Sequence, residues 1–287
     1  MEHVADLLKA VLFGIVEGVT EWVPVSSTGH MILLNEFIRM DVTPEFWSVF
    51  LVVIQLGAVL AAVITFFDRL WPLDLSRSAR LRGHILKRDI LRLWWLIIIA
   101  CVPAVIVGLL FDDIFDALFY NGISVSIALI VFGVGFIIVE NRNRGRAPYV
   151  DTMEGLTVRN ALLIGLFQVL AAVFPGTSRS GATILGGLIL GISRSVAAEF
   201  TFLLAVPVML GASLLKLVKY GLHFSSTELI ILLVGMAVAF VVSLFVIRFF
   251  MSYIRRHDFK VFGWYRIVLG AIVLSYFLVR EGMQYGV

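Results

Sequence analysis

The chain has 287 residues, a formal net charge of +3 at pH 7, and a composition that is 60% hydrophobic. Soluble domains contain about 45–50% apolar residues, so this composition excludes an ordinary water-soluble domain. The small net charge gives no support for a nucleic-acid partner, and the single cysteine, Cys101, excludes a disulfide framework and a Cys/His metal cluster.

The apolar segments are about twenty residues long, which is the length of a membrane-spanning helix and about twice that of a spanning strand. The sequence therefore predicts an all-α, polytopic membrane helix bundle that forms a single integral membrane domain over residues 1–287. Six complete spans are expected, at residues 46–67, 93–111, 123–139, 199–218, 229–250 and 262–279.

Two further apolar regions, 4–38 and 155–192, are interrupted by polar residues, prolines and glycines. Each half of such a region is too short to cross a hydrocarbon core of about 30 Å. Irregular backbone at that depth is tolerated only where protein buries it or where it lines a wet cavity. Both regions are therefore predicted to be re-entrant, broken-helix hairpins that enter and leave the membrane on one side.

The two broken regions carry the same residues at the same spacing, which indicates an internal repeat. In each, a glycine is followed three residues later by Glu or Gln and ten residues later by proline: Gly14, Glu17 and Pro24, then Gly165, Gln168 and Pro175. Two pairs recur downstream: Glu45-Phe46 with Gly57-Ala58, then Glu199-Phe200 with Gly211-Ala212. Each copy, roughly 4–139 and 155–279, holds a hairpin and three spans. Because three is odd, the second copy is inverted relative to the first, as in many proteins with a midplane site.

Charge in the loops predicts the orientation, because cytoplasmic loops are enriched in Lys and Arg. The loops on one side carry most of the basic residues: Arg69, Arg77, Arg80, Arg82, Lys87, Arg88 and Arg92, then Arg142, Arg144 and Arg146, then Arg255, Arg256 and Lys260. We expect that side to be cytoplasmic and both termini to lie outside. The first hairpin then enters from outside, the second enters from the cytoplasm, and their tips meet near the midplane.

Glu17 and Glu21 lie four residues apart, so a helix places both carboxylates on one face. Two carboxylates within an apolar helix are costly, and their mutual repulsion adds to the cost. A divalent cation between them would remove that cost, and Mg²⁺ or Ca²⁺ favours oxygen ligands, so a metal site is predicted at this pair. The alternatives are carboxylates hydrogen-bonded to neighbouring helices, or a proton relay.

The run from Pro24 to His30 ends one helix and begins the next. Capping is the usual role of Ser or Thr at such a point, and packing is the usual role of an isolated histidine. Because the acids lie on the other arm of this hairpin, catalytic roles are predicted for Ser27 and His30 together with Glu17 and Glu21. Ser26 and Thr28 are expected to contact a substrate phosphate.

The corresponding run of the second hairpin, 175–183, combines glycines and small hydroxyl residues before a helix. Such a run forms a nest of N–H donors at a positive helix end. Arg179 adds a planar fork suited to phosphate oxygens, and is predicted to be catalytic as well. The alternative is a structural ion pair with Glu17, Glu21 or Glu199. The predicted phosphate-binding residues of this run are Gly176, Thr177, Ser178, Arg179, Ser180 and Thr183.

The two motif regions make the chain resemble the undecaprenyl-diphosphate phosphatase family, also called the bacitracin-resistance family. The matching motifs are Glu17-Gly18-Val19-Thr20-Glu21, Pro24-Val25-Ser26-Ser27-Thr28-Gly29-His30 and Pro175-Gly176-Thr177-Ser178-Arg179-Ser180-Gly181-Ala182-Thr183. The resemblance implies a metal-dependent enzyme of the bacterial plasma membrane that hydrolyses the C55 polyprenyl diphosphate to the monophosphate and inorganic phosphate. It also implies lipid-carrier recycling for cell-wall synthesis, competition with bacitracin for the diphosphate, and a site open to the outer face.

The resemblance also implies roles for the residues at the matching motif positions. The family's acidic pair corresponds to Glu17 and Glu21, and its serine nucleophile to Ser27. The family's histidine corresponds to His30, and its phosphate-binding arginine to Arg179.

The residues by themselves leave two functions open. A transporter or lipid flippase shares inverted repeats and broken helices, whereas the convergence of acids, hydroxyls, histidine and anion nest favours phosphate chemistry. Within a phosphatase, attack by Ser27, by His30 or by a metal-bound water all remain open. The choice of metal also remains open, and a homo-oligomer is compatible with the sequence.

Overall fold

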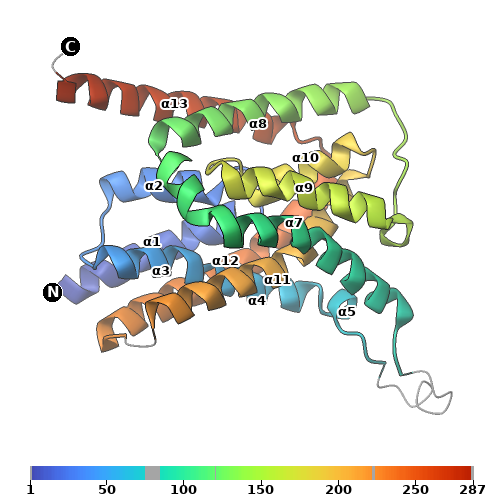
Figure 1. Cartoon of the computed structure of the whole chain (residues 1–287), viewed down its shortest axis with the longest axis horizontal. Coiled ribbons are helices and arrows are strands. Elements are labelled where there is room, and N and C mark those ends of the chain that lie inside the picture. Colours follow the sequence, from blue (N-terminus) through green and yellow to red (C-terminus); the bar gives the residue numbers. More distant parts are fainter. Residues whose placement is uncertain (1, 75–84, 120, 222–223, 286–287) are drawn as a thin grey trace.

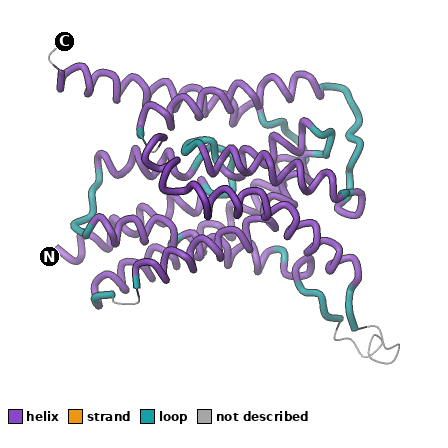
Figure 2. The backbone as a smooth tube through the Cα atoms, viewed as in Figure 1, coloured by secondary structure: helices purple, strands orange, loops and turns teal. Residues whose placement is uncertain are grey.

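The computed structural model describes residues 2–74, 85–119, 121–221 and 224–285, and these parts of the chain form helices and no strand. The helices lie side by side in a bundle (Figures 1 and 2). Their bounds are α1 Glu2–Thr20, α2 Ser27–Phe37, α3 Pro44–Val53, α4 Gln55–Thr65, α5 Phe67–Leu70, α7 Arg88–Phe119, α8 Gly122–Asn143, η1 Met153–Gly155, α9 Val158–Val173, α10 Arg179–Ile189, α11 Arg194–Tyr220, α12 Ser226–Ile254 and α13 Lys260–Tyr285.

Six segments of the described chain are long and apolar enough to cross a membrane, which confirms the six predicted spans. They are Pro44–Thr65, Arg88–Phe111, Gly122–Asn143, Arg194–Tyr220, Ser226–Ile254 and Lys260–Arg280. The last four extend beyond the predicted segment at both ends, and Arg88–Phe111 does so at its start. The reason is that a helix continues through the polar headgroup layers where hydropathy falls. The first span is interrupted at Ile54, where α3 ends and α4 begins.

Each of the two broken regions folds as two helices joined by a turn. The first turn separates α1 from α2, and the second separates α9 from α10. Pro24 and Pro175 lie within these turns, where a missing backbone N–H cannot disturb a helix. The second arms, α2 and α10, have 11 residues each, so each reaches only about 17 Å.

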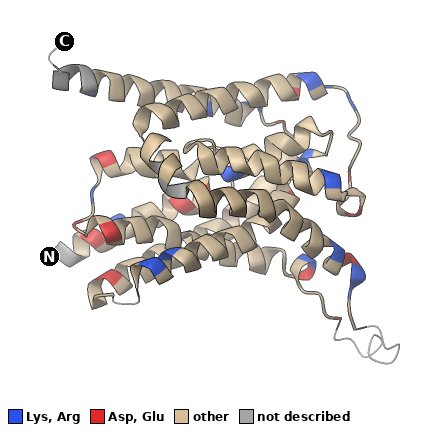
Figure 3. Ribbon diagram, in the orientation of Figure 1, with Lys and Arg blue, Asp and Glu red and all other residues tan. Residues whose placement is uncertain are grey.

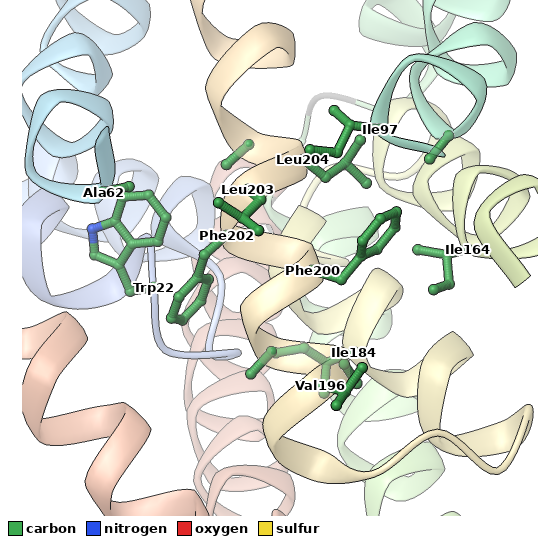
Figure 4. Packing of buried hydrophobic residues seen from close by; sticks show 14 of the residues in the cluster. Trp22, Ala62, Ile97, Ile164, Ile184, Val196, Phe200, Phe202, Leu203 and Leu204 are labelled. Atoms are coloured by element: carbon green, nitrogen blue, oxygen red, sulfur yellow. The ribbon is translucent and has the colours of Figure 1, made fainter. Parts of the chain in front are cut away.

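The helix α11 forms the centre of the bundle. Every residue from 196 to 206 is buried except Glu199. Figure 4 shows Phe200 and Phe202 of α11 with Trp22 on one side and Ile164 on the other. The rings of Trp22 and Phe202 meet edge to face with centroids 4.9 Å apart. The first turn, which contains Trp22, therefore packs directly against the central helix.

Glycines bring the first arms of both hairpins close to long helices. A Cβ at Gly14 would lie 2.7 Å from a carbonyl oxygen of α12, and one at Gly165 would lie 2.4 Å from a carbonyl oxygen of α7. These glycines, which marked the repeat in the sequence, therefore permit close helix packing. Gly57 likewise lies against α12, but an added Cβ at Gly211 would have nothing within 4 Å. The sequence match between Gly57 and Gly211 is therefore not accompanied by similar helix packing.

Most charged residues of the described chain lie toward the two ends of the bundle (Figure 3). The start of α1 and the end of α13 lie at one end, on the left of Figure 1, and α5 and the start of α7 lie at the other. At this second end, Glu140 of α8 accepts hydrogen bonds from Arg194 and from the backbone N–H of Phe259, which precedes α13. The loops predicted to be basic thus meet at one end. Of their residues, Arg77, Arg80 and Arg82 lie outside the described part of the chain.

Candidate functional site

The two turns share an unusual backbone conformation. Among the described residues, Ser26 and Ser178 are the only non-glycine residues with positive φ, at 75° and 70°. Each caps the helix that follows it: Ser26 Oγ accepts a hydrogen bond from Gly29 N at 3.2 Å, and Ser178 Oγ accepts one from Gly181 N at 3.1 Å. Strained backbone of this kind persists where surrounding structure enforces it, often at functional sites.

The carboxylate of Glu21 lies between the starts of α2 and α10. Its Oε2 accepts a hydrogen bond from Ser27 Oγ at 2.8 Å, and its Oε1 accepts one from Arg179 Nη2, also at 2.8 Å. Ser180 Oγ donates to the backbone oxygen of Glu21 at 3.1 Å. The tips of the two hairpins, which are more than 150 positions apart in sequence, therefore meet through a buried acid.

Glu17 lies one helical turn before Glu21, whose backbone N–H still donates to the carbonyl of Glu17 at 3.0 Å. The predicted shared face of the two acids is thus formed. Glu17 is 1% exposed, and its Oε1 has no hydrogen-bond partner in the described part of the chain. A buried carboxylate oxygen without a partner is costly, and it is an open ligand position for a cation.

The donor set for a cation is small. Among the described residues, no group of three or more His, Cys, Asp and Glu side chains is arranged to hold a metal ion. The pair Glu17 and Glu21 would therefore supply two carboxylates, with the remaining ligands coming from substrate and water. Mg²⁺ commonly binds in that way, through one or two carboxylates and substrate phosphates, so the residues present fit a hard cation.

His30 lies in the first turn of α2 but contacts α13. Its Nδ1 donates to the carbonyl oxygen of Ser26 at 2.7 Å, and its Nε2 lies 2.7 Å from the hydroxyl of Tyr265. A carbonyl can only accept, so the hydrogen-bond network assigns the proton of the neutral ring to Nδ1, and Nε2 accepts from the tyrosine. In the described part of the chain, the side chain bonded to Ser27 Oγ is that of Glu21 and not that of His30.

The guanidinium of Arg179 donates hydrogen bonds to a carboxylate and to a backbone carbonyl of a helix. Besides Glu21, it donates to the backbone oxygen of Thr201 in α11 at 3.1 Å, and its side chain is 13% exposed. Of the three acids predicted as alternative ion-pair partners of Arg179, Glu21 is therefore the one that it contacts. Glu199 is not, because it lies 3.2 Å from Arg69 Nε at the basic end of the bundle.

A family model described as "Bacitracin resistance protein BacA" matches residues 10–272. The chain belongs to the BacA family. Similar relatives include "Undecaprenyl-diphosphatase 1" of Clostridium acetobutylicum, which is 60% identical over 97% of this chain and 100% of its own length. "Undecaprenyl-diphosphatase" of Desulfitobacterium hafniense is 55% identical over 96% of this chain and 97% of its own. That of Enterococcus faecalis is 54% identical over 94% and 96%. The family resemblance that the motifs indicated is confirmed over nearly the whole chain.

In this BacA-family chain, the hydroxyls predicted to bind phosphate are differently placed. Ser178 Oγ and Ser180 Oγ lie 3.1 Å apart beside the acid. Thr183 Oγ1 donates to the carbonyl of Arg179 at 2.9 Å and accepts from Thr201 Oγ1 at 2.9 Å, so it is engaged with helix backbone and α11. Thr177 Oγ1 is buried without a hydrogen-bond partner among the described residues.

The start of α10 retains backbone donors for an anion. Ser178 takes the N–H of Gly181, while the N–H groups of the first two helical residues, Arg179 and Ser180, have no intrahelical acceptor by helix geometry. The start of α2 has the same arrangement at Ser27 and Thr28. Two helix N-termini therefore meet at Glu21, where an anionic group is stabilised by both.

Two residues of this BacA-family site were missed in the sequence: Tyr265 and Arg266 of α13. Tyr265 contacts His30, and Arg266 is fully buried against both turns. A signal existed, because an arginine inside an apolar span is rare and usually functional. It was overlooked because α13 carries no motif and lies far from both hairpins in sequence.

Proposed function

We propose that this BacA-family chain hydrolyses undecaprenyl diphosphate to undecaprenyl phosphate and inorganic phosphate at the buried cluster where α1, α2 and α10 meet. The observation that carries the proposal is the Glu21 carboxylate, shared between the Ser27 hydroxyl and the Arg179 guanidinium. Relatives named undecaprenyl-diphosphatase support the substrate and reaction. The product is the lipid carrier for cell-wall synthesis, and hydrolysis removes the diphosphate for which bacitracin competes.

In the proposed mechanism, Ser27 Oγ attacks the terminal phosphorus. A bond forms between Oγ and that phosphorus, and the bond from phosphorus to the bridging oxygen breaks, which releases undecaprenyl phosphate. The proton of Ser27 passes to Glu21 Oε2, which lies 2.8 Å away. Water then attacks the seryl phosphate, inorganic phosphate leaves, and Ser27 regains its proton from Glu21. Attack by His30 or by water stays the alternative.

The proposed role of Arg179 is to bind the terminal phosphoryl group in place of Glu21. Its planar fork suits phosphate oxygens, and the N–H groups at the start of α10 add fixed dipoles. Phosphoryl transfer depends mostly on positioning and on charge stabilisation by such preorganised groups. We further propose that His30 takes a proton from the water that attacks the seryl phosphate and returns it to the departing inorganic phosphate.

The proposed divalent cation would be held by the carboxylates of Glu17 and Glu21. Its chemistry would be to neutralise negative charge on the phosphate oxygens. The unpartnered buried oxygen of Glu17 supports this assignment.

We also propose that the chain consists of two inverted copies, roughly 4–139 and 155–279, with both hairpins re-entrant. In support, α1 packs against α12 of the second copy while α9 packs against α7 of the first, and α8 packs against its counterpart α13. The basic loops favour a cytoplasmic location for their end of the bundle. Both termini would then lie outside, and the site would open to the extracytoplasmic side.

The test is phosphate release from undecaprenyl diphosphate by the purified chain in detergent, with Mg²⁺ or Ca²⁺ and with EDTA. We expect metal-dependent release that Glu21→Gln reduces by about 10³-fold, within the range for an acid–base group. Glu154→Gln is the matched control, because Glu154 also faces an arginine but lies at the basic end. A folded protein that releases no phosphate with either metal would instead favour a transporter or flippase.

A further inference from the structure

Arg266 is a buried arginine without an acidic partner. Its side chain is 0% exposed, and within the described residues no carboxylate lies in ion-pair range of it. Its guanidinium instead donates only to backbone carbonyl oxygens. These belong to Pro24 at 3.1 Å, Gly176 at 3.0 Å, Thr177 at 2.8 Å and Leu129 at 3.4 Å.

These acceptors come from both turns of the site. Pro24 belongs to the turn between α1 and α2, whereas Gly176 and Thr177 belong to the turn between α9 and α10. A turn deep in a bundle leaves backbone carbonyls that helix hydrogen bonds do not satisfy, and such groups are costly in an apolar setting. Arg266 satisfies them with a rigid fork of up to five N–H donors, and the carbonyls in turn solvate its buried charge.

The guanidinium is also confined sterically. A Cβ at Gly181 would lie only 3.0 Å from Arg266 Nη1, so the arginine lies directly against the start of α10. On another side its Cζ lies 5.8 Å from the centroid of the Phe132 ring, a distance at which an aromatic ring attracts a cation. The side chain therefore has one position that joins both turns to α8.

The two arginines of the site link the turns in different ways. Arg179 reaches across to the Glu21 side chain, and under the proposed function a phosphate takes that acid's place. Arg266 uses only backbone carbonyl acceptors and is fully buried. Binding of an anion would thus loosen the first link and leave the second intact.

We propose that Arg266 is a positioning residue that holds the two turns in register while Arg179 exchanges Glu21 for the phosphate. This inference rests on the proposed function. It assigns to α13 the task of keeping Ser27 and Glu21 on one turn aligned with Arg179 on the other. The neighbouring Tyr265 holds His30, so the same helix also fixes the imidazole.

The test compares Arg266→Lys and Arg266→Met with Arg194→Lys in the full-length protein. Arg194 is a matched control because it also bonds a buried group, the Glu140 carboxylate, but away from the site. Misalignment of reacting groups by about 1 Å costs about 10²-fold in rate, so we expect kcat to fall by about that factor in Arg266→Met. KM should change by less than about threefold, because Arg179 remains to bind phosphate.

Lysine keeps the charge but cannot reach carbonyls on both turns from one nitrogen, so Arg266→Lys should fall between Met and wild type. Hydrogen–deuterium exchange provides the readout that a general loss of stability would not reproduce. Exchange should accelerate at the amides of 25–29 and 176–181 in both Arg266 variants, and not in Arg194→Lys.

Four outcomes separate the possibilities. A folded Arg266→Met with wild-type kcat overturns the inference. So does a rate loss matched by Arg194→Lys at equal loss of thermal stability, or local exchange that is unchanged. An inactive wild type instead removes the proposed function, and the exchange measurement then still reports whether Arg266 holds the turns together.

Discussion

The turns that precede α2 and α10 share one backbone feature, a capping serine at positive φ, and differ in chemistry. Both place a serine at positive φ, and both use its hydroxyl to cap the following helix. The residue after that serine is Ser27 in the first turn and Arg179 in the second. In the preceding helix, the first hairpin carries Glu17 where the second carries Gln168.

This contrast shows how one local structure can provide two halves of a site. The shared serine geometry positions two helix N-termini, and the side chains then divide the tasks into an acid with a hydroxyl on one turn and a phosphate-binding fork on the other. The division also explains the pairing at Glu21, because each turn lacks the charge that the other supplies.

The largest expected effect comes from removing the hydroxyl of Ser27, which stands in the first turn where the second turn has Arg179. Ser27→Ala should reduce kcat by about 10³-fold or more, because the nucleophile is lost. The measurement is phosphate release, together with acid-quench mass spectrometry for phosphate on Ser27 in the wild type. A Ser27→Ala protein with wild-type turnover would instead leave His30 or water as the attacking group, and His30→Gln would then separate those two.

The next effect concerns the fork on the second turn. Arg179→Lys should lower kcat/KM by about 10²-fold, as for loss of one preorganised donor. The reason is that one ammonium nitrogen replaces the two guanidinium nitrogens that reach Glu21 and the Thr201 carbonyl. Arg248→Lys, at an exposed arginine of α12, is the control and should keep wild-type kinetics. Equal kinetics for the two variants would remove Arg179 from the phosphate site.

A smaller effect tests whether the two turns share one backbone device. Ser26→Ala and Ser178→Ala should each destabilise the protein by about 1–2 kcal/mol, because each loses a cap and places alanine at positive φ. Glycine adopts a positive φ without strain, so Ser26→Gly and Ser178→Gly should each destabilise the protein by only about a few tenths of a kcal/mol. Reversible unfolding in mixed micelles measures the differences. Glycine variants as unstable as the alanine variants would show that φ is not strained.

The smallest effect concerns Gln168, which corresponds to Glu17 but has no role in the proposed reaction. Both polar atoms of its side chain are buried without a partner in the described part of the chain. Replacing it with methionine should therefore stabilise the protein by about 1 kcal/mol and leave turnover intact. Glu17→Gln places the amide of the second hairpin at the corresponding position of the first, and this variant should lose activity. An inactive Gln168→Met protein would place Gln168 within the site.

Much of the fold could be predicted because the bilayer imposes a strong local rule. A span needs about twenty apolar residues, so all six spans could be located from the sequence, and only the positions of their ends differed. The two breaks were visible for the same reason, since prolines and polar runs stand out in an apolar segment. The chemistry of Glu17, Glu21 and Arg179 was conspicuous because ionisable residues are rare at such positions.

Other features depended on packing between helices. The partner of Arg179 was one of three candidate acids, and only the arrangement of α1, α10 and α11 selected Glu21 and left Glu199 to Arg69. The pairing of His30 with Tyr265 joins residues 235 positions apart. No periodicity relates such positions, because their distance depends on how α13 packs against α2 and α8.

The sequence by itself determined that this protein is a membrane helix bundle with two interrupted hairpins. It also showed that these hairpins carry the acidic, hydroxyl and arginine residues typical of phosphate chemistry. Apolar length and the cost of buried charge act locally along the chain and so are readable in it. Only the tertiary structure decided that Ser27 bonds Glu21, that Glu21 bonds Arg179, and that Arg266 joins both turns through backbone carbonyls. The physical reason is that hydrogen bonds require separations of about 3 Å, which only the packing of distant helices can set.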